Sequence, residues 1–416
     1  MIAYVLKTYP RFSQTFILAE ILEMEAAGRE IIVISLEKPN DGRFHEDLAR
    51  VRAEVRYLPE RASGHPWRYF SSHGRALLRS PLRYLSALGR ALRWLPTSWK
   101  GFLRAPLIAE QASEAGCTRL HAHFASLPAI STLFAARLMG VPFTFTAHAR
   151  DIYHRSRSPR MIANLLRETE RTITISDYNR RRLEALGGSL AAPVTRIYSH
   201  VDTRRFVPGA APAREPPIIL AIGRLVEKKG FVHLIDACAL LARRGIDFHC
   251  RIIGKGPLLG ELRQRIEQQD IADRVSLEGP RSRPHLQRLL PLARALAAPC
   301  VIGADGDRDG LPTVILEAMA CAVPVVSTPV TGIPEAVIDE ATGLLVPQAD
   351  PGALAAALWR LLVDEELCRR LGRAARARAV ELFDTHHNVR HFASLLDDCP
   401  CPTPGCAPVL EESQAL

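Results

Sequence analysis

The sequence predicts an α/β protein built from two doubly wound, Rossmann-like domains that face each other across a cleft. Its 416 residues are enough for two domains with cores of their own. Short apolar segments alternate with longer segments of helical period, as in parallel sheets joined by crossover helices. This alternation stops in a segment rich in proline and alanine, 208–217, and then restarts. We therefore expect a first domain at 1–207, a linker at 208–217 and a second domain at 218–384.

The individual elements follow from apolar period and from helix start and stop signals. In the first domain, strands are expected at 2–6, 30–35, 119–124, 141–147, 172–176 and 194–199, and helices at 13–27, at 127–139 and directly after 176. In the second domain, strands are expected at 218–223, 248–254, 274–279, 295–299, 323–327 and 343–347, and helices at 230–244, 257–269, 284–290, 313–321, 351–363 and 365–381. A last helix at about 385–397 precedes a proline-rich tail, 398–416, which we expect to be disordered.

Composition excludes several classes of protein. The hydrophobic share of 47% and the charged share of 24% are ordinary for globular domains. No run of 18 or more apolar residues predicts a transmembrane helix, and the N-terminus is typical of a first strand rather than a signal peptide. Six of the nine cysteines stand singly in apolar or helical segments, which indicates reduced core residues and a cytoplasmic protein. The other three lie in the tail, without a histidine after them to complete a metal site: Cys399, Cys401 and Cys406.

The charge is concentrated in the first half of the chain. Residues 1–200 hold 29 Lys and Arg against 17 Asp and Glu, whereas residues 201–416 hold 25 against 27. Nine basic residues and no acidic one lie between Glu60 and Glu110. Such a segment suits an anionic partner, which could be nucleic acid, phospholipid or a diphosphate lipid.

The segment GRLVEKKGF (223–231) is the first of three motifs that come at strand ends in the second domain. Gly223 closes a strand, Gly230 precedes a helix, and Arg224 and Lys229 flank the turn. Two cations beside a helix N-terminus suit a diphosphate, although a solvated charged loop is the alternative. The second motif, IIGKGPLLGEL (252–262), places Gly254 at a strand-to-helix turn, where a ligand could approach the backbone or the turn could simply be tight.

The third motif, DGLPTVILEAMACAVPVV (309–326), separates two carboxylates, Asp309 and Glu317, by eight positions. Asp309 and Gly310 lie in the expected loop, and Glu317 lies about one turn into the following helix. The N–H groups of Thr313 and Val314 begin that helix and could meet an anion. Carboxylates accept hydrogen bonds from sugar hydroxyls, so this pair could hold a ribose and a hexose on either side of a diphosphate.

These three motifs, in this order and spacing, resemble the family-four retaining glycosyltransferases of the GT-B fold. Asp309 stands where that family usually has glutamate. The resemblance implies that Arg224 and Lys229 hold the donor diphosphate, that Glu317 holds the ribose and that Asp309 holds the donor sugar. The turn that begins at Leu277 would lie near the base.

The same resemblance assigns acceptor binding to the first domain and nucleotide-sugar binding to the second, with the helix at about 385–397 crossing back onto the first. It implies no cofactor and no metal, because Arg and Lys neutralise the leaving diphosphate. A divalent ion at Asp305-x-Asp307 is the alternative.

The first domain is similar to the branch of this family that builds exopolysaccharides, the colanic-acid type. The similar segments are TYPRFSQTFILAE (8–20), HAHFA (121–125), FTFTAHARDIY (143–153), ISDYN (175–179) and HVDTRRF (200–206). The resemblance implies that His148, at the end of a strand, contacts the donor sugar as a catalytic residue. We expect His121 and His123 to point to opposite faces of their strand, with His123 the better candidate for the cleft.

The function implied is transfer of a hexose, with retention of configuration, from a nucleotide diphosphate sugar to a glycan or lipid-linked acceptor. Two alternatives are an oxidoreductase or non-catalytic nucleotide-binding protein of Rossmann type, and a nucleic-acid-binding protein. No G-x-G-x-x-G follows either first strand, which disfavours the oxidoreductase. The basic half lacks interleaved aromatic residues and any known binding motif, so we expect no nucleic-acid partner.

The basic segment at 65–99 has helical period, and Ser80-Pro81 should restart the helix. In its second half, Leu85, Leu88 and Leu92 share one face and Arg83, Arg90 and Arg93 share another. This pattern fits two structures. It could bind an anionic membrane at the inner face of the cytoplasmic membrane, or it could be an ordinary amphipathic helix on the sheet with a solvated basic face.

Overall fold

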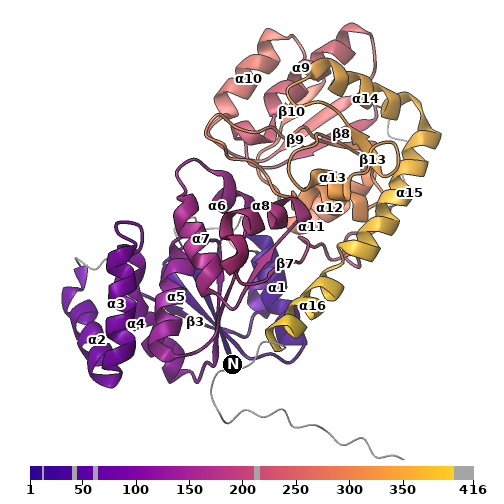
Figure 1. Ribbon diagram of the computed structural model, residues 1–416. Coiled ribbons are helices and arrows are strands. Elements are labelled where there is room, and N and C mark those ends of the chain that lie inside the picture. Colours follow the sequence, from indigo (N-terminus) through magenta and orange to yellow (C-terminus); the bar gives the residue numbers. More distant parts are fainter. Residues whose placement is uncertain (12–13, 40–44, 60–63, 210–215, 398–416) are drawn as a thin grey trace, which may run out of the picture.

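The structure, a computed structural model, describes residues 1–11, 14–39, 45–59, 64–209 and 216–397 (Figure 1). The first domain contains β1 (Ile2–Thr8), α1 (Thr15–Ala26), β2 (Ile31–Glu37), β3 (Glu54–Tyr57), α2 (Pro66–Arg79), α3 (Pro81–Arg93), α4 (Trp99–Glu114), β4 (Arg119–His123), α5 (Leu127–Met139), β5 (Phe143–Ala147), α6 (Ala149–Tyr153), α7 (Pro159–Glu168), β6 (Arg171–Thr174), α8 (Asp177–Gly187) and β7 (Val194–Arg196). The second contains β8 (Ile218–Ile222), α9 (Phe231–Arg243), β9 (His249–Ile253), α10 (Leu259–Gln268), β10 (Val275–Leu277), α11 (Arg283–Leu289), β11 (Ala295–Ala298), α12 (Thr313–Ala320), β12 (Val325–Ser327), α13 (Ile333–Ala336), β13 (Gly343–Leu345), α14 (Pro351–Val363) and α15 (Glu365–Leu382). The last helix is α16 (Thr385–Asp397).

Two parallel sheets confirm the predicted fold class. Their strand orders are β3-β2-β1-β4-β5-β6-β7 and β10-β9-β8-β11-β12-β13, with every pairing parallel. Each sheet begins at a central strand, runs to one edge and restarts on the other side of that strand. The strand order therefore switches between β1 and β4 and between β8 and β11, and ligands of such sheets bind beyond the carboxyl ends at these points.

Helices cover both faces of each sheet, as the near-continuous apolar strands require. On the first sheet, Tyr4 joins a buried cluster with Ile21 of α1 and Phe392 of α16, whereas its neighbour Val5 joins the opposite cluster with Phe102 of α4 and Leu133 of α5. In the second domain, α9 and α14 cover one face and α12 and α15 the other.

The C-terminal helices join the two domains. In Figure 1, α15 runs down the side of the second domain and α16 continues onto the first, where it packs against α1. At the crossing, the Val201 N–H donates to the carbonyl of Phe383 at 2.8 Å, and the Thr385 N–H donates to the carbonyl of Val201 at 3.0 Å. The domains are thus fixed to each other by backbone hydrogen bonds as well as by the chain.

The predicted strands and helices are present with shifts of a few residues at their ends, but the edge strand β3 and the helices α4, α6, α7 and α13 were not predicted individually. The six described cysteines are free and buried, as expected. Residues 210–215 of the expected linker and 398–416 of the expected tail lie outside the described residues. No helix in the part of the chain that the structure describes is long and apolar enough to cross a bilayer.

Candidate functional site

The switch point of the second domain lies between the loops that follow β8 and β11. Gly223 and Arg224 come directly after β8, and Lys229 ends the same loop before α9 begins. Asp309 ends the loop that leads from β11 to α12. The strand order thus brings the first and third sequence motifs together.

Lys229 and Asp309 form a nearly buried ion pair. The Lys229 Nζ lies 2.6 Å from Asp309 Oδ2, and both side chains are about 15% exposed. Burial alone raises the pKa of Asp309, but Lys229 and the neighbouring Lys228 outweigh this effect and lower the pKa to about 2. Burial alone lowers the pKa of Lys229, whereas the charge of Asp309 raises it above its usual value. Both groups are therefore charged at neutral pH, and the exposed Arg224 adds a further cation to this turn.

Lys228 is a residue that the sequence analysis did not select. It lies between two of the three aspartates of this loop, with Nζ 3.3 Å from Asp309 Oδ1 and 3.1 Å from Asp307 Oδ1. The other aspartate of the D-x-D element, Asp305, lies 3.2 Å from His154 Nε2. Both aspartates of the D-x-D element, Asp305 and Asp307, therefore face basic side chains. This arrangement favours a structural role for them over the alternative of a divalent ion.

Two glycines in these turns are required by close backbone packing. Gly230 has φ of +66°, and a Cβ there would lie 1.9 Å from the carbonyl oxygen of Pro299. Gly254 has φ of +159°, and its Cβ would lie 1.8 Å from the carbonyl oxygen of Gly223. The glycine at 254 lets the second motif pack on the turn that carries Arg224, which accounts for its residue type without a ligand.

Helix α12 presents the remaining residues of the third motif. Thr313 and Val314 form its first turn, where N–H groups have no intrahelical acceptor. Glu317 lies one turn later, and no ion pair of its carboxylate is found among the described residues. Burial raises the pKa of Glu317, while the charge of Arg283 partly opposes this. An acceptor group held in such surroundings gains from ligand hydroxyls that replace its lost water. Leu277, the candidate beside the base, ends β10 and is partly buried.

The loop that carries Asp309 touches the first domain beside His148. A Cβ on Gly310 would lie 2.8 Å from Ile175 Cδ1 and 3.3 Å from Ala149 Cβ, so this glycine allows close approach of the domains. Ala149 follows His148 directly. The loop that follows Asp309 therefore packs against the residue that follows His148.

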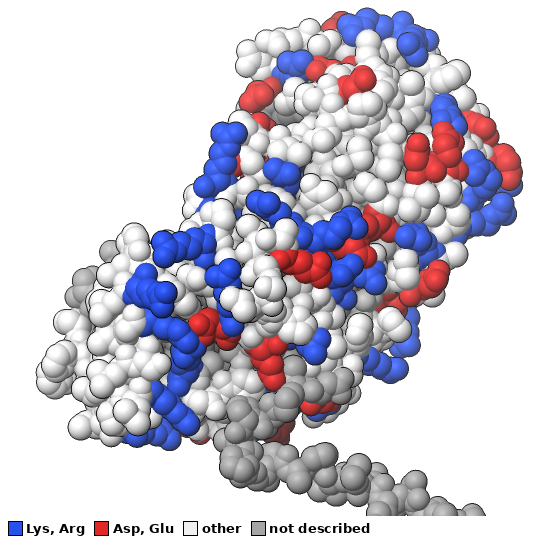
Figure 2. Space-filling model, viewed as in Figure 1, with Lys and Arg blue, Asp and Glu red and all other residues white. Residues whose placement is uncertain are grey.

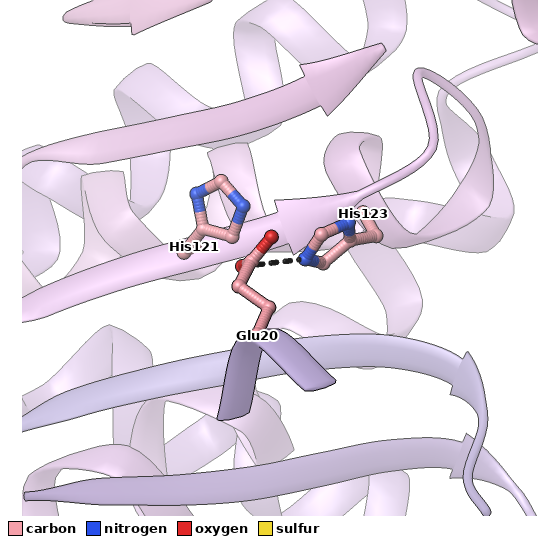
Figure 3. A group of neighbouring side chains, drawn as sticks. All are labelled: Glu20, His121 and His123. Carbon is pink, nitrogen blue, oxygen red and sulfur yellow. Dashed lines mark hydrogen bonds and ion pairs between the residues drawn. The ribbon is translucent and has the colours of Figure 1, made fainter. Parts of the chain in front are cut away.

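A chain of hydrogen-bonding groups lies behind His148, at the switch point of the first domain. Tyr4 Oη donates to Glu20 Oε1 at 2.9 Å, His123 Nε2 lies 3.1 Å from the same oxygen, and His123 Nδ1 lies 3.4 Å from His148 Nε2. Figure 3 shows Glu20 reaching from α1 toward His123 on β4. The pKa of Glu20 is raised by burial, but His123, His121 and His200 lower it to about 2. Burial, and to a lesser extent the charge of His123, lowers the pKa of His148 to about 3. Near neutral pH, Glu20 is thus a carboxylate, and His148, at the end of the chain of groups, is a neutral imidazole.

The prediction that His121 and His123 point to opposite faces is wrong. Side chains alternate along a strand, so residues two apart share a face. Both side chains are fully buried, and their ring centroids are 5.0 Å apart (Figure 3). His121 lies behind the chain, where Nδ1 contacts Thr144 Oγ1 at 2.8 Å and Nε2 contacts Thr146 Oγ1 at 3.2 Å.

Glu20, His121 and His123 are also close enough to hold a metal ion, since one ligand atom of each lies within 4.8 Å of the others. Both nitrogens of His121 already contact threonine hydroxyls, and the oxygen of Glu20 is shared by Tyr4 and His123. These contacts favour a hydrogen-bonded chain over a metal site, because a ligating nitrogen must present a free lone pair.

Two further features of this site escaped the sequence analysis. Asp151, one turn after His148, accepts hydrogen bonds from the backbone N–H groups of Ala125 at 3.1 Å and His148 at 3.4 Å. Phe124 has φ of +77°, which is strained for a bulky residue, and its ring centroid lies 4.7 Å from that of His148. Both residues belong to quoted motifs, HAHFA and FTFTAHARDIY, but only the fold shows that they surround His148.

The basic segment at 65–99 forms α2 and α3, which lie beside α4 at the far end of the first domain (Figure 1). Four large apolar side chains stand out of it, with exposed fractions between 71% and 85%: Trp67, Phe70, Leu78 and Leu82. Two of the three arginines expected on the basic face of α3 are bound by other parts of the first domain. Arg83 donates to the carbonyl of Met139, and Arg90 pairs with Glu168 at 3.2 Å. Small buried residues, Ala87 and Ala91, hold α3 on the domain, while Leu85 and Leu92 are more than half exposed.

Comparisons with known proteins agree with this geometry. The family description "Glycosyl transferases group 1" matches residues 203–378, and "Glycosyltransferase Family 4" matches residues 13–205. The chain is 30% identical over 414 residues to the glycosyltransferase WcaL of Escherichia coli (strain K12), named for colanic acid biosynthesis, covering 95% of this chain and 99% of the relative. It is 35% identical over 246 residues to the amylovoran biosynthesis glycosyltransferase AmsK of Erwinia amylovora, covering 59% of each.

Solved structures show the same fold at lower identity. The Anabaena protein Alr3699/HepE, crystallised with UDP, superposes with a TM-score of 0.72 at 18% identity and covers 95% of this chain and 99% of its own. Sucrose-phosphate synthase from Thermosynechococcus elongatus gives a TM-score of 0.71 at 20% identity, with coverage of 95% and 98%. The chain is therefore a glycosyltransferase that belongs to the family-four enzymes of the GT-B fold and resembles the branch that synthesises exopolysaccharides.

Proposed function

We propose that this enzyme transfers a hexose, with retention of configuration, from a nucleotide diphosphate sugar to a glycan or lipid-linked acceptor of an exopolysaccharide. The observation that carries the proposal is the Lys229–Asp309 pair at the switch point of the second domain, with Arg224 on the same turn. A fixed cation and a fixed carboxylate within 2.6 Å suit a ligand that presents a diphosphate next to sugar hydroxyls.

In this proposal, Arg224 and Lys229 stabilise the charge that develops on the leaving diphosphate, which is electrostatic catalysis by preorganised cations. Thr313 and Val314 offer N–H groups of α12 to the same phosphates. Glu317 accepts hydrogen bonds from the ribose, and Asp309 accepts them from the donor sugar while holding Lys229. Gly223, Gly254, Gly310 and Leu277 shape the backbone around the nucleotide.

His148 contacts the donor sugar from the first domain. Its low pKa keeps it neutral, so its Nδ1 can accept one hydrogen bond from a sugar hydroxyl without adding a charge. Glu20 and His123 are positioning residues: the carboxylate keeps a proton on His123 Nε2, which leaves Nδ1 as an acceptor for the Nε2–H of His148. This contact fixes the tautomer and orientation of the His148 ring.

In this proposal, α2 and α3 of the first domain bind an anionic membrane surface, the inner face of the cytoplasmic membrane. Exposed Trp67, Phe70 and Leu78 share one face of α2, because their positions differ by three and eight residues. The exposed Arg68 and Arg79 lie beside them on the same helix. Large apolar side chains flanked by arginine are the composition of an interfacial helix.

The proposal is tested by incubating the purified protein with a panel of nucleotide diphosphate sugars and measuring released nucleoside diphosphate, with and without excess chelator. We expect one donor to be consumed, with no loss of turnover in chelator, because Arg224 and Lys229 supply the positive charge. Turnover that requires added magnesium or manganese would contradict the metal-free mechanism. Consumption of NADH with no nucleotide-sugar turnover would favour the oxidoreductase alternative.

A further inference from the structure

A groove at the junction of the two domains concentrates positive charge that the proposed donor site does not use. It lies between α6 and α8 of the first domain and the loop before α12 of the second, and it holds about 490 Å³. Its lining residues are Ile152, Tyr153, Tyr178, Arg181, Arg182 and Arg308. Among the described residues, no carboxylate lines the groove, so three guanidinium groups face one space of ligand size.

Two aromatic rings give this groove a fixed wall. The guanidinium of Arg308 lies 4.7 Å from the ring centroid of Tyr153, a cation–π contact between the domains. The ring of Tyr178 lies 5.9 Å from that of Tyr153, centroid to centroid. Tyr153 Oη donates to Asn179 Oδ1 at 3.1 Å, which holds the first ring in place. A sugar ring can pack its apolar face on such a wall while its charged group meets arginine.

Neighbouring carboxylates are engaged outside the groove. Glu335 accepts the backbone N–H groups of Asp177 and Tyr178, each at 2.8 Å. Asp177 pairs with Arg180 at 2.8 Å, and Arg180 also pairs with Glu184 at 3.2 Å. These contacts order the start of α8. They do not involve Arg181 or Arg182, which are both exposed, so these two charges are available to a ligand in the groove.

The position of the groove connects it with group transfer. Arg308 directly precedes Asp309, the residue proposed to hold the donor sugar. One wall of the groove is thus one residue along the chain from the side chain proposed to hold the donor sugar, and the other residues that line it belong to the first domain. Figure 2 shows further basic side chains over α3 and α7, where a second groove of about 410 Å³ includes Arg93, Arg160 and Arg167.

We propose that the groove lined by Tyr153, Tyr178, Arg181, Arg182 and Arg308 binds a negatively charged group of the acceptor. Planar guanidinium groups match the geometry of both carboxylate and phosphate. The charged group is thus the carboxylate of an acidic sugar residue or the phosphate of the carrier. This inference rests on the proposed glycosyltransferase reaction and names the chemical class of its second substrate.

The test compares three small probes by titration calorimetry: methyl β-glucuronide, glucose 1-phosphate and the neutral methyl β-glucoside. Each is titrated into the full-length protein, once alone and once with UDP or GDP added to fill the diphosphate site. The variant Arg181→Gln/Arg182→Gln removes two charges from the groove. The matched control is Arg243→Gln/Arg244→Gln, an exposed arginine pair at the end of α9 in the second domain.

We expect the wild-type protein to bind at least one charged probe about tenfold more tightly than the neutral one, the effect of one charge-assisted contact. The groove variant should lose this preference and the control should keep it. Preference for the glucuronide identifies an acidic sugar, and preference for the sugar phosphate identifies the carrier. Equal affinity for all three probes, or a preference that survives in the groove variant, would overturn the inference. Failure of UDP and GDP to bind would instead count against the proposed donor site, since the titrations without nucleotide report on the groove alone.

Discussion

Lys229 Nζ lies 2.6 Å from Asp309 Oδ2, and these two residues come from the loops after the two strands, β8 and β11, at which the order of the second sheet switches. Because each side chain is about 15% exposed, neither charge is well solvated without the other. A diphosphate that enters this site must share Lys229 with Asp309. In the proposed donor site, the pair would therefore link the stability of the domain to nucleotide binding.

Asp309→Asn should destabilise the nucleotide-free protein, because it leaves Lys229 as a nearly buried charge without its counterion. Breaking such a pair costs about 3–5 kcal/mol. A bound nucleoside diphosphate would replace the lost counterion, so the rise in melting temperature on adding UDP or GDP should be larger in the variant than in the wild type. Thermal unfolding with and without nucleotide measures both effects. A smaller nucleotide-induced rise in the variant would show that the phosphates do not contact Lys229.

Glu20→Gln should lower kcat without changing nucleotide affinity. The amide keeps a similar shape but removes the charge that holds a proton on His123 Nε2, so His148 loses its fixed tautomer. We expect kcat to fall about tenfold, which corresponds to about 1.4 kcal/mol of activation free energy.

Nitrogen-15 NMR of the histidines provides the readout that a purely structural effect would not move, since the signals of His148 should shift toward a mixture of tautomers. Glu23→Gln is the control, because Glu23 lies on the same helix but pairs with His386. If both variants lose the same activity, the chain from Glu20 to His148 has no positioning role.

The stability of the protein should fall with acidification from about pH 6.5, before Asp309 and Glu20 titrate. Burial, followed by the charge of His123, lowers the pKa of His121 to about 3, whereas an unfolded chain has a histidine pKa of about 6.5. Between these values the unfolded chain binds a proton that the folded protein does not, so stability decreases as pH falls. Asp309 and Glu20 have pKa values of about 2 in the folded protein. The stabilisation that their charges provide is lost only as the pH falls from about 4 to 2.

His121→Gln removes this one titration while keeping a hydrogen-bonding side chain. Its free energy of unfolding should change less with pH between 4.5 and 6, by up to about 1.4 kcal/mol per pH unit. Urea unfolding of both proteins across this range provides the measurement. An unchanged slope would mean that His121 is protonated in the folded protein.

Replacing Trp67, Phe70 and Leu78 together by serine should release the protein from anionic vesicles. Their exposed fractions are 73%, 71% and 85%, so the substitution removes apolar surface without opening the core. Sedimentation with vesicles at low and high salt measures binding, and the electrostatic part should weaken at 1 M salt, where the Debye length is about 3 Å.

Leu190→Ser, at a leucine that is 75% exposed elsewhere on the first domain, is the control for the membrane-binding test. Arg83 and Arg90 are unsuitable targets for charge reversal, because they already bind Met139 and Glu168. A wild-type protein that ignores anionic vesicles at low salt would refute the membrane role.

Much of the fold follows from local sequence. Helices with clear period and proline at their start, such as Pro351–Val363, were predicted to the residue, and so was Leu127–Met139. Strand β3 was missed because its sequence, EVRY, carries charge at an edge where one side of the strand meets solvent. Helix α4 was missed because Pro106 interrupts its pattern, although tertiary packing buries Phe102 and Ile108 beside it.

The candidate site was predictable where it is local and hidden where it depends on distant contacts. The cations beside β8 and the carboxylates of 309–317 lie in short motifs at strand ends. The family resemblance selected Lys229, but the contact of Lys228 with Asp309 could not be predicted, since only the backbone path decides which side chain reaches which oxygen. Glu20 lies 103 positions from His123 along the chain, and the pairing of β1 with β4 brings them together.

The most direct test of the donor site compares the affinities of nucleoside mono- and diphosphates for the wild type and for two variants, Lys229→Ala and Glu317→Gln. If Lys229 holds the β-phosphate, its variant should lose about 1.5–3 kcal/mol for the diphosphate and little for the monophosphate. If Glu317 holds the ribose, its variant should weaken both ligands equally. Titration calorimetry with UDP, UMP, GDP and GMP gives all the constants. Equal losses for mono- and diphosphate in Lys229→Ala, or unchanged affinities in Glu317→Gln, would contradict the proposed donor site.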